Sequence, residues 1–175
     1  MNKNQNPPST AQKMERWKPS VTVAAIIEQD GLFLLLEEHT VDGLRLNNPA
    51  GHLDPAESPI QACIRETLEE TARVLTPTAL VGIYLSRFVR PAQGERPVED
   101  VTYLRFAFCG TVGGEIAGKG YDDGIVRTLW MTPDEVRTSY ARHRSPLVLQ
   151  CMEDYLCGKR LPLDAIYTHA MVTAG

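Results

Sequence analysis

Three carboxylates, Glu66, Glu69 and Glu70, are the residues of this chain whose type and spacing could do chemistry. Separations of three and four residues place all three on one face of a helix, within about one turn. Like charges this close repel each other unless a cation lies among them, and a hard divalent cation takes oxygen ligands. The spacing therefore favours a site for a hard divalent cation. A glutamate-rich face that is only solvated is the competing interpretation.

The helix that must carry these glutamates has a well-marked beginning. Ser58 is a favourable N-cap, Pro59 suits the first turn, and Gln61 completes a Ser-x-x-Gln capping box. Arg65 follows two turns later, where its side chain can reach the next turn of the helix or Glu57 in the preceding loop. The sequence thus predicts one face of carboxylates with an arginine beside it.

A longer pattern surrounds this helix. Six residues stand at fixed offsets: Gly51, Glu57, Arg65, Glu66, Glu69 and Glu70. Five residues separate Gly51 from Glu57, seven separate Glu57 from the pair Arg65-Glu66, and two separate that pair from Glu69-Glu70. Ordinary residue frequencies would produce this match roughly once in ten million windows. The pattern is the Nudix box, and the chain resembles the Nudix hydrolase superfamily. The resemblance implies an α/β fold, the α/β/α sandwich built on a mixed sheet.

Three positions depart from the usual box. Thr67 and Arg73 stand where aliphatic residues are typical, and Ala72 replaces a glycine that normally ends the helix in a left-handed conformation. Alanine in that conformation costs about 1 kcal/mol, so we expect the helix to continue past Ala72 until Thr76-Pro77 stops it. Because every charged box position is kept, the departures leave the chemistry intact.

Segments outside the box narrow the resemblance to the NudJ phosphatase branch of the superfamily. They are residues 18–24, 48–53, 104–106, 144–148 and 158–163. The resemblance covers about residues 17 to 166. It implies a Mg²⁺-dependent hydrolase of nucleoside tri- and diphosphates, and of the thiamine precursor hydroxymethylpyrimidine pyrophosphate, that releases orthophosphate.

The resemblance implies Mg²⁺ as the metal, with Mn²⁺ as the alternative. The expected metal ligands are Glu66, Glu69 and Glu70, and the resemblance adds the backbone carbonyl of Ala50. Divalent ions held by carboxylates neutralise phosphates and lower the pKa of bound water. Glu70 is the favoured general base. The residues expected to take part in catalysis or to support it are Glu57, Arg65, Glu66, Glu69 and Glu70. A further acid is common in the family in the loop before Trp130, where Asp122 and Asp123 stand as additional acids or as plain turn residues.

Substrate contacts are expected from the strand around residues 101–109. Alternation places Tyr103 and Arg105 on one face, suited to stacking on a base or contacting phosphate, while the other face suits the core. Arg87 and Arg90 are alternative phosphate contacts or merely solubilising residues, and His52 beside the box could bond a phosphate. Ser145 is expected to act as a helix N-cap.

The remaining pattern predicts one domain at residues 17–175 after a disordered or loosely attached tail at residues 1–16. Strands are expected at residues 21–27, 32–36, 79–90, 100–112 and 126–131, with a short helix after Thr132-Pro133 and a last helix from Ser145-Pro146 to Gly158. The first two strands read as a hairpin.

Composition points to a cytoplasmic enzyme. The net charge of −4 argues against an interface with polymeric nucleic acid, and apolar runs of bilayer-spanning length or a signal-peptide region are missing from the sequence. The four cysteines follow neither zinc spacing nor a disulfide framework and are expected to be reduced core residues: Cys63, Cys109, Cys151 and Cys157. The expected partner is a small phosphorylated substrate, and both a monomer and a homodimer fit the sequence.

Two other functions stay open. One is a Nudix pyrophosphatase that acts on ADP-ribose or other nucleoside diphosphate derivatives and releases a monophosphate. The other is a Nudix-like module that binds a nucleotide without cleaving it. Modules of that kind typically lose box carboxylates, whereas this chain keeps them.

Overall fold

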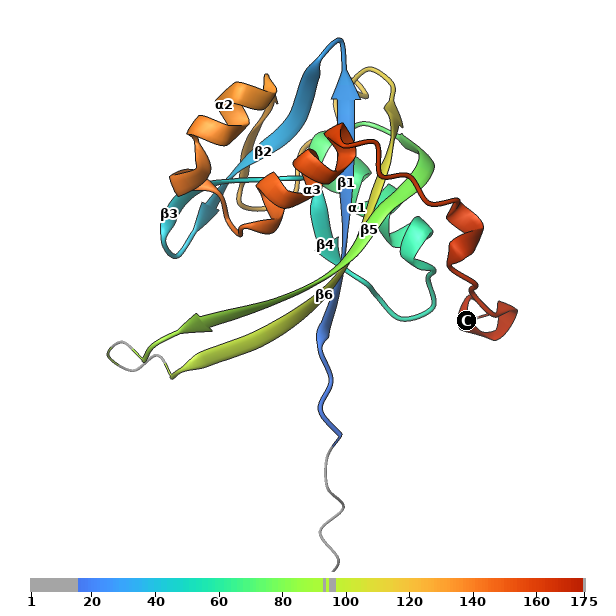
Figure 1. Ribbon diagram of the computed structural model, residues 1–175, viewed down its shortest axis with the longest axis horizontal. Helices are drawn as coiled ribbons and strands as arrows, with labels where there is room; N and C mark the ends of the chain where they lie inside the picture. Colours follow the sequence, from blue (N-terminus) through green and yellow to red (C-terminus); the bar gives the residue numbers. More distant parts are fainter. Residues whose placement is uncertain (1–15, 93, 95–96, 175) are drawn as a thin grey trace, which may run out of the picture.

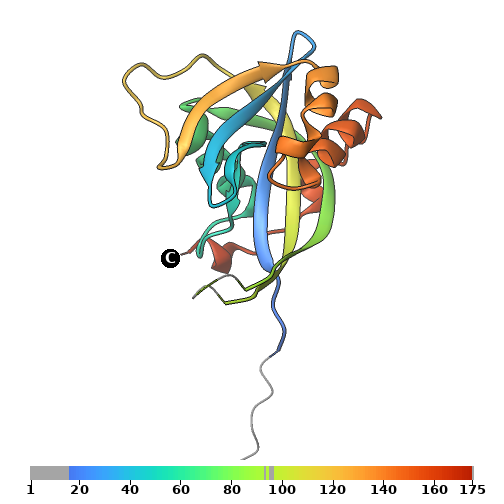
Figure 2. The same cartoon turned by 90° about the vertical axis from the view of Figure 1, so that its left-hand side faces the viewer.

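The computed structural model describes residues 16–92, 94 and 97–174, so the tail expected at residues 1–16 lies outside the described part except for Arg16. Within that part, seven strands form one mixed sheet with helices on both sides (Figures 1 and 2). The strands are β1 (Ser20–Gln29), β2 (Leu32–Thr40), β3 (Gly43–Asn47), β4 (Ala50–His52), β5 (Leu75–Arg90), β6 (Glu99–Val112) and β7 (Ile125–Met131). The helices are α1 (Pro59–Thr71), α2 (Pro133–Thr138) and α3 (Leu147–Leu156), with short 3₁₀ turns at Tyr140–Arg142, Leu163–Ala165 and Ala170–Val172.

The sheet is ordered β3-β2-β1-β6-β5, with β4 paired to β1 and β7 paired to β2. β1 runs parallel to β6, and the other named pairs are antiparallel. The expected hairpin of the first two strands is confirmed, with both strands longer than predicted. The sequence pattern missed the short strands β3 and β4, which carry few β-branched residues to mark them.

Two cores lie on opposite faces of the sheet, which makes the fold the α/β/α sandwich that was expected. The core on the α1 side includes Val23, Ala25, Ile27, Cys63 and Phe108. The core on the α2 and α3 side includes Ile26, Ala107, Cys109, Cys151 and Met152. Because β1 is buried on both faces, its sequence is a nearly continuous apolar run. Cys157 is exposed, so the expectation that all four cysteines lie in the core is wrong for this one.

The β5–β6 hairpin extends away from the rest of the molecule (Figure 1). Its two strands stay paired from Leu75 with Val112 to Arg90 with Glu99, and the register shifts twice near Leu80. The half of the hairpin near Leu80 packs in the body, while the half near Arg90 projects beyond it. The projecting half forms one wall of the cleft described below.

Helix α1 begins as predicted and ends earlier than predicted. The Ser58 hydroxyl accepts a hydrogen bond from the Gln61 amide, and the Gln61 side-chain oxygen accepts one from the Ser58 amide, which completes the capping box. The expected extension past Ala72 is wrong, because Ala72 is left-handed at φ 53° and ends the helix. The buried Leu75 starts β5 three residues later, and the Ala72 carbonyl accepts a hydrogen bond from Ile116. These contacts offset the conformational cost of about 1 kcal/mol.

The beginning of α3 also differs from expectation. Pro146 occupies the N-cap position, and within the described residues no side chain caps this helix. The hydroxyl of Ser145 is instead buried without a hydrogen-bond partner in that part of the chain, so its expected role as N-cap is wrong. None of the helices in the described ranges is both long and apolar enough to cross a membrane.

Candidate active site

One cleft of about 1000 Å³ gathers most of the residues that the sequence predicted for the site. It is bounded by the α1 carboxylates and β4 at one end and by the projecting half of the β5–β6 hairpin at the other. The predicted residues that line it are Ala50, Gly51, His52, Glu66, Glu70, Arg87, Tyr103 and Arg105. Glu57, Arg65, Glu69, Asp122 and Asp123 are not among its described lining residues.

Strand β4 brings the chain close to α1 at Gly51. A β carbon placed on Gly51 would lie 2.0 Å from the carboxyl carbon of Glu66, so any side chain there would displace that carboxylate. One residue earlier, the Ala50 amide donates a hydrogen bond to Glu70 Oε2 at 2.7 Å. The glutamates of α1 therefore lie directly against the backbone of residues 50 and 51, where the resemblance implies a carbonyl ligand.

Arg65 ties the loop before α1 to the helix. Its Nε and Nη2 donate to both carboxylate oxygens of Glu57, at 3.0 and 2.8 Å. Its Nη1 donates to Glu66 at 2.8 Å and to Glu69 at 2.9 Å. The hydrogen bonds from Arg65 hold the pKa of Glu57 below its ordinary value. The guanidinium is thus shared between the loop and the carboxylate face.

The carboxylates that face the cleft are electrostatically unfavourable as anions. Burial raises the pKa of Glu70 to about 8, the Ala50 amide opposes that shift, and the negative charges of Glu66, Glu38 and Asp122 add to it. Burial also raises the pKa of Glu66, against the opposing effect of Arg65. A bound cation would stabilise both groups in their charged form.

The donor set fits a divalent cation by chemistry. Glu66, Glu70 and the Ala50 carbonyl are the oxygen ligands that Mg²⁺ and Mn²⁺ prefer. Glu69 is directed to Arg65, and in the described part of the chain no three Asp, Glu, His or Cys side chains already form a metal-binding group. An ion would therefore replace Arg65 as the positive partner of Glu66 and Glu69.

The two candidate acids before Trp130 are in different positions. The Asp122 amide donates to the backbone carbonyl of Glu69 at 3.1 Å, and the Asp122 charge raises the pKa of Glu66 and Glu70. Asp123 has no such effect on either glutamate among the described groups. The structure therefore brings Asp122, and not Asp123, to the carboxylate face.

Strand β6 presents its two faces as predicted. Phe106 and Phe108 pack in the core on the α1 side, while Tyr103 and Arg105 line the cleft. Arg105 Nε and Nη1 are buried, and neither has a hydrogen-bond partner in the described residues. Burial lowers the pKa of Arg105 below its ordinary value. This guanidinium is a buried cation directed into a cleft.

Sequence reasoning missed two polar residues of the cleft. Glu38 on β2 binds Arg144 at 2.9 Å, and Asn47 on β3 lies beside it. Burial raises the pKa of Glu38, and the Arg144 charge opposes the shift. The sequence gives no sign of these two residues. They reach the cleft through the pairing of β2 with β3, which a local sequence pattern does not reveal.

Two other residues predicted to contact the substrate, Arg87 and His52, already have neighbours within the protein. Arg87 forms two hydrogen bonds with Asp100, at 2.8 and 2.7 Å, and is largely exposed. The ring of His52 lies 6.4 Å from that of Tyr103, tilted by 46°. His52 and Tyr103 thus form an aromatic pair at the wall of the cleft, whereas Arg87 is held by a neighbour on its own hairpin.

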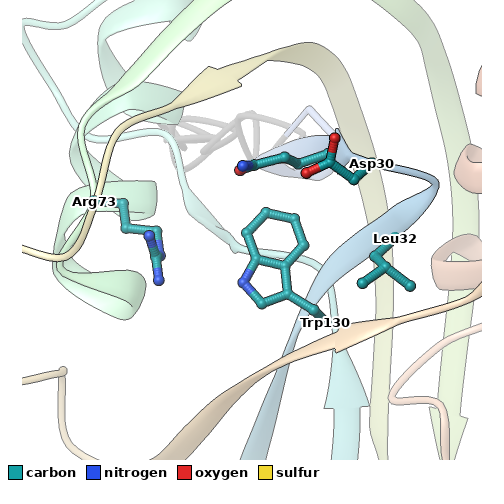
Figure 3. A pocket seen from close by; sticks show the side chains of 5 residues that line it. Asp30, Leu32, Arg73 and Trp130 are labelled. Carbon is teal, nitrogen blue, oxygen red and sulfur yellow. The ribbon is translucent and has the colours of Figure 1, made fainter.

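A second, smaller pocket of about 280 Å³ lies near the turn between β1 and β2 (Figure 3). It is lined by Gln29, Asp30, Leu32, Arg73 and Trp130. The Arg73 guanidinium lies 5.9 Å from the Trp130 ring and donates to the Gly113 carbonyl. This pocket contains a single carboxylate and none of the predicted site residues, so the larger cleft is the candidate active site.

Comparison with known proteins shows the family to which this chain belongs. The family model described as the NUDIX domain matches residues 16–151. The phosphatase NudJ of Escherichia coli strain K12 is 34% identical over 151 residues, which cover 86% of this chain and 92% of that protein. A NUDIX hydrolase structure from Nitrosomonas europaea is 49% identical, with a TM-score of 0.77 and coverage of 87% and 98% of the two chains.

A more distant structure supports the fold alone. An ADP-ribose pyrophosphatase from Streptococcus suis is 19% identical, with a TM-score of 0.56 over 79% of this chain and 92% of that one. The family match and the nearer relatives cover most of the sequence, including the helix that carries the glutamates. The chain therefore belongs to the Nudix hydrolase family and is a hydrolase, as the box predicted.

Proposed function

We propose that this enzyme cleaves phosphoanhydride bonds of nucleoside tri- and diphosphates and of hydroxymethylpyrimidine pyrophosphate, and that it releases orthophosphate. One observation carries the proposal. Glu66 and Glu70 face the same cleft as the buried Arg105 guanidinium, which has two N–H groups without partners among the described residues. Glu66 and Glu70 need a cation as partner, and Arg105 needs an anion. A polyphosphate bound with a divalent ion supplies both.

The metal in this proposal is Mg²⁺, with Mn²⁺ as the alternative. Glu66, Glu69, Glu70 and the Ala50 carbonyl would hold it, and the bound ion would neutralise phosphate charge and lower the pKa of water. Glu70 would accept the proton of the attacking water. Its hydrogen bond from the Ala50 amide fixes one carboxylate oxygen and leaves the other for that proton.

Three further residues would bind the substrate. Arg105 would hold a phosphate through Nε and Nη1, which have no partner in the described residues, since guanidinium groups bind pairs of oxygen atoms. Tyr103 and His52 would contact the ring of the base or pyrimidine. Arg87 would reach a phosphate only by leaving Asp100. Asp122 would support the metal site from outside the ligand shell.

The similarity to the phosphatase NudJ supports release of orthophosphate over release of pyrophosphate. The net charge of −4 supports a small phosphorylated substrate over polymeric nucleic acid. We also infer a cytoplasmic enzyme, in agreement with its four free cysteines.

The experiment is a Mg²⁺-dependent turnover assay on nucleoside triphosphates, nucleoside diphosphates, hydroxymethylpyrimidine pyrophosphate and ADP-ribose, with orthophosphate and pyrophosphate measured separately. We expect orthophosphate from the first three. Glu70→Gln should lower kcat by a factor of about 10² to 10⁴, the usual contribution of a general base. Glu153→Gln, which alters an exposed ion pair between α2 and α3, is the matched control and should keep full activity.

Other products would redirect the proposal. Pyrophosphate, or AMP formed from ADP-ribose, would make the enzyme a Nudix pyrophosphatase. Tight nucleotide binding without turnover would make it a nucleotide-sensing module. Full activity of Glu70→Gln would remove Glu70 from the chemistry.

A further inference from the structure

An ion pair connects two distant segments at the outer end of the cleft. Arg90, the last residue of β5, donates through Nη2 to Asp42 Oδ2 at 2.9 Å. Asp42 lies in the turn between β2 and β3, 48 positions earlier in the chain. Both residues line the cleft. Figure 1 places this turn and the projecting hairpin on the same side of the molecule.

The Arg90 guanidinium is held in one orientation by its neighbours. Its Nη1 donates to Glu99, the first residue of β6, and its Cζ lies 4.9 Å from the ring centre of Phe88. Only 21% of the Arg90 side chain is exposed, against 64% for Arg87 on the same hairpin. Arg90 is thus a fixed part of the cleft wall, whereas Arg87, which also lines the cleft, is largely exposed and is held by Asp100.

The wall encloses an aromatic end of the cleft, opposite the carboxylates. Phe88, Asp42 and Arg90 line this end, and the aromatic pair of Tyr103 and His52 lies between it and the carboxylates. Aromatic side chains here offer faces on which a planar heterocycle can stack. The phosphate-binding groups Glu66, Glu70 and Arg105 line the other part of the same cleft.

We propose that Asp42 and Arg90 form a clasp that closes the outer end of the cleft over the heterocycle of the substrate and sets how tightly that ring is bound. This inference rests on the proposed function, since it assigns the ring-bearing part of a nucleotide or pyrimidine pyrophosphate to this end. Asp42 draws the β2–β3 turn toward the hairpin, and Arg90 keeps the Phe88 ring in place. In this assignment neither residue would contact the phosphate that is cleaved from the substrate. The clasp therefore acts on substrate selection and leaves the bond cleavage to the α1 carboxylates.

The test compares a nucleoside triphosphate with inorganic triphosphate, which has the phosphates and no ring. Asp42→Asn preserves the size of the side chain and removes its charge. We expect the ratio of kcat/KM for the nucleotide to kcat/KM for inorganic triphosphate to fall by a factor of about three to ten, the usual contribution of an aromatic contact. If inorganic triphosphate is bound and not cleaved, the reciprocal of its inhibition constant replaces its kcat/KM in the ratio. Glu153→Gln is the control and should leave the ratio unchanged.

A double-mutant cycle tests whether the two residues act together. Arg90→Gln should lower the same ratio, and the double variant should be no worse than Arg90→Gln alone, because each single change already opens the clasp. An unchanged ratio in Asp42→Asn, or additive effects of the two changes, would overturn the clasp. Failure of the wild-type protein to cleave either triphosphate would instead overturn the proposed function, and the clasp with it.

Discussion

Gly51 and Glu66 lie so close together that a β carbon on Gly51 would stand 2.0 Å from the carboxyl carbon of Glu66. Glu66 comes from α1 and Gly51 from β4, and β4 pairs with the central strand β1. The glycine therefore sets how near the carboxylate face can approach the Ala50 carbonyl. This close approach needs a residue without a side chain, although the backbone conformation itself does not demand glycine.

Gly51→Ala should reduce activity far more than stability. The new methyl group would displace the Glu66 carboxylate, which is the mobile end of a flexible side chain, so the fold can adjust. A displacement of about 1 Å in a reacting constellation can lower the rate by about 10². We expect kcat/KM to fall by about that factor, while Tm changes by less than about 4 °C.

Gly114→Ala is the matched control for this change. A β carbon on Gly114 meets nothing within 4 Å in the described structure, and its φ is not left-handed. Kinetics and thermal unfolding of both variants would check the prediction. Equal losses of activity in the two variants would show that Gly51 has no special role.

Arg105→Met should stabilise the protein while it weakens catalysis. The guanidinium has two buried N–H groups that lack partners in the described chain, and each unsatisfied buried polar group costs about 1 to 3 kcal/mol. Methionine removes those groups and fills much of the space. We expect Tm to rise by a few degrees, and KM for a nucleoside triphosphate to rise at least about tenfold because a phosphate contact is lost.

Arg87→Met provides the comparison. Its guanidinium is exposed and paired with Asp100, so the change should alter Tm and KM little. The measurements are thermal unfolding and steady-state kinetics on the same preparations. A fall in Tm for Arg105→Met would mean that Arg105 is satisfied in the protein without substrate.

The local features of the site were predictable because each depends on residues close together within one helix or one strand. The capping box of Ser58 and Gln61 and the spacing of Glu66, Glu69 and Glu70 are properties of the helix itself. The alternation along β6 likewise separated Tyr103 and Arg105 from the core face.

Contacts between distant segments were not predictable in the same way. Glu38 and Arg144 meet only because β2 pairs with β3 and the segment before α3 returns to that edge. Ala72 adopts a conformation that alanine disfavours because the buried Leu75 requires the chain to turn at once. Tertiary packing there outweighs a local preference of about 1 kcal/mol.

The pH dependence of stability should reveal Glu70. Burial raises its pKa to about 8 in the folded protein without metal, against 4.5, the ordinary value of a glutamate, in the unfolded chain. The folded state binds this proton more tightly, so the contribution to stability is full below pH 4.5 and is lost as the pH rises to about 8. We expect Tm in the presence of a chelator to fall across this window, and Glu70→Gln to flatten the fall.

Mg²⁺ should reverse this fall in Tm at pH values at which Glu70 is charged. Its carboxylate binds a cation only when deprotonated, so the rise in Tm on adding Mg²⁺ should be larger at pH 8.5 than at pH 6. Thermal unfolding at both pH values, with and without Mg²⁺, checks this. The same rise at both values would place the ion away from Glu70.

Glu57→Gln should weaken metal binding although Glu57 does not line the cleft. Arg65 divides its hydrogen bonds between Glu57 on one side and the pair of Glu66 and Glu69 on the other. With the charge of Glu57 removed, Arg65 is held more strongly by Glu66 and Glu69. A metal ion must then compete with a closer cation. We expect the Mg²⁺ concentration for half-maximal activity to rise by about 10-fold, the lower end of the range for residues that support a metal ligand.

Asp54→Asn separates this effect from a general loss of negative charge. Asp54 also approaches Arg65, but at 3.6 Å and with 63% of its side chain exposed, so its interaction is weaker. Its change should leave the Mg²⁺ requirement within about twofold of wild type, since exposed ion pairs contribute about 0 to 1 kcal/mol. Calorimetric titration of Mg²⁺ into each variant measures the affinity without turnover. If both variants bind Mg²⁺ like wild type, Arg65 does not compete with the ion, and the loop before α1 supports the helix by packing alone.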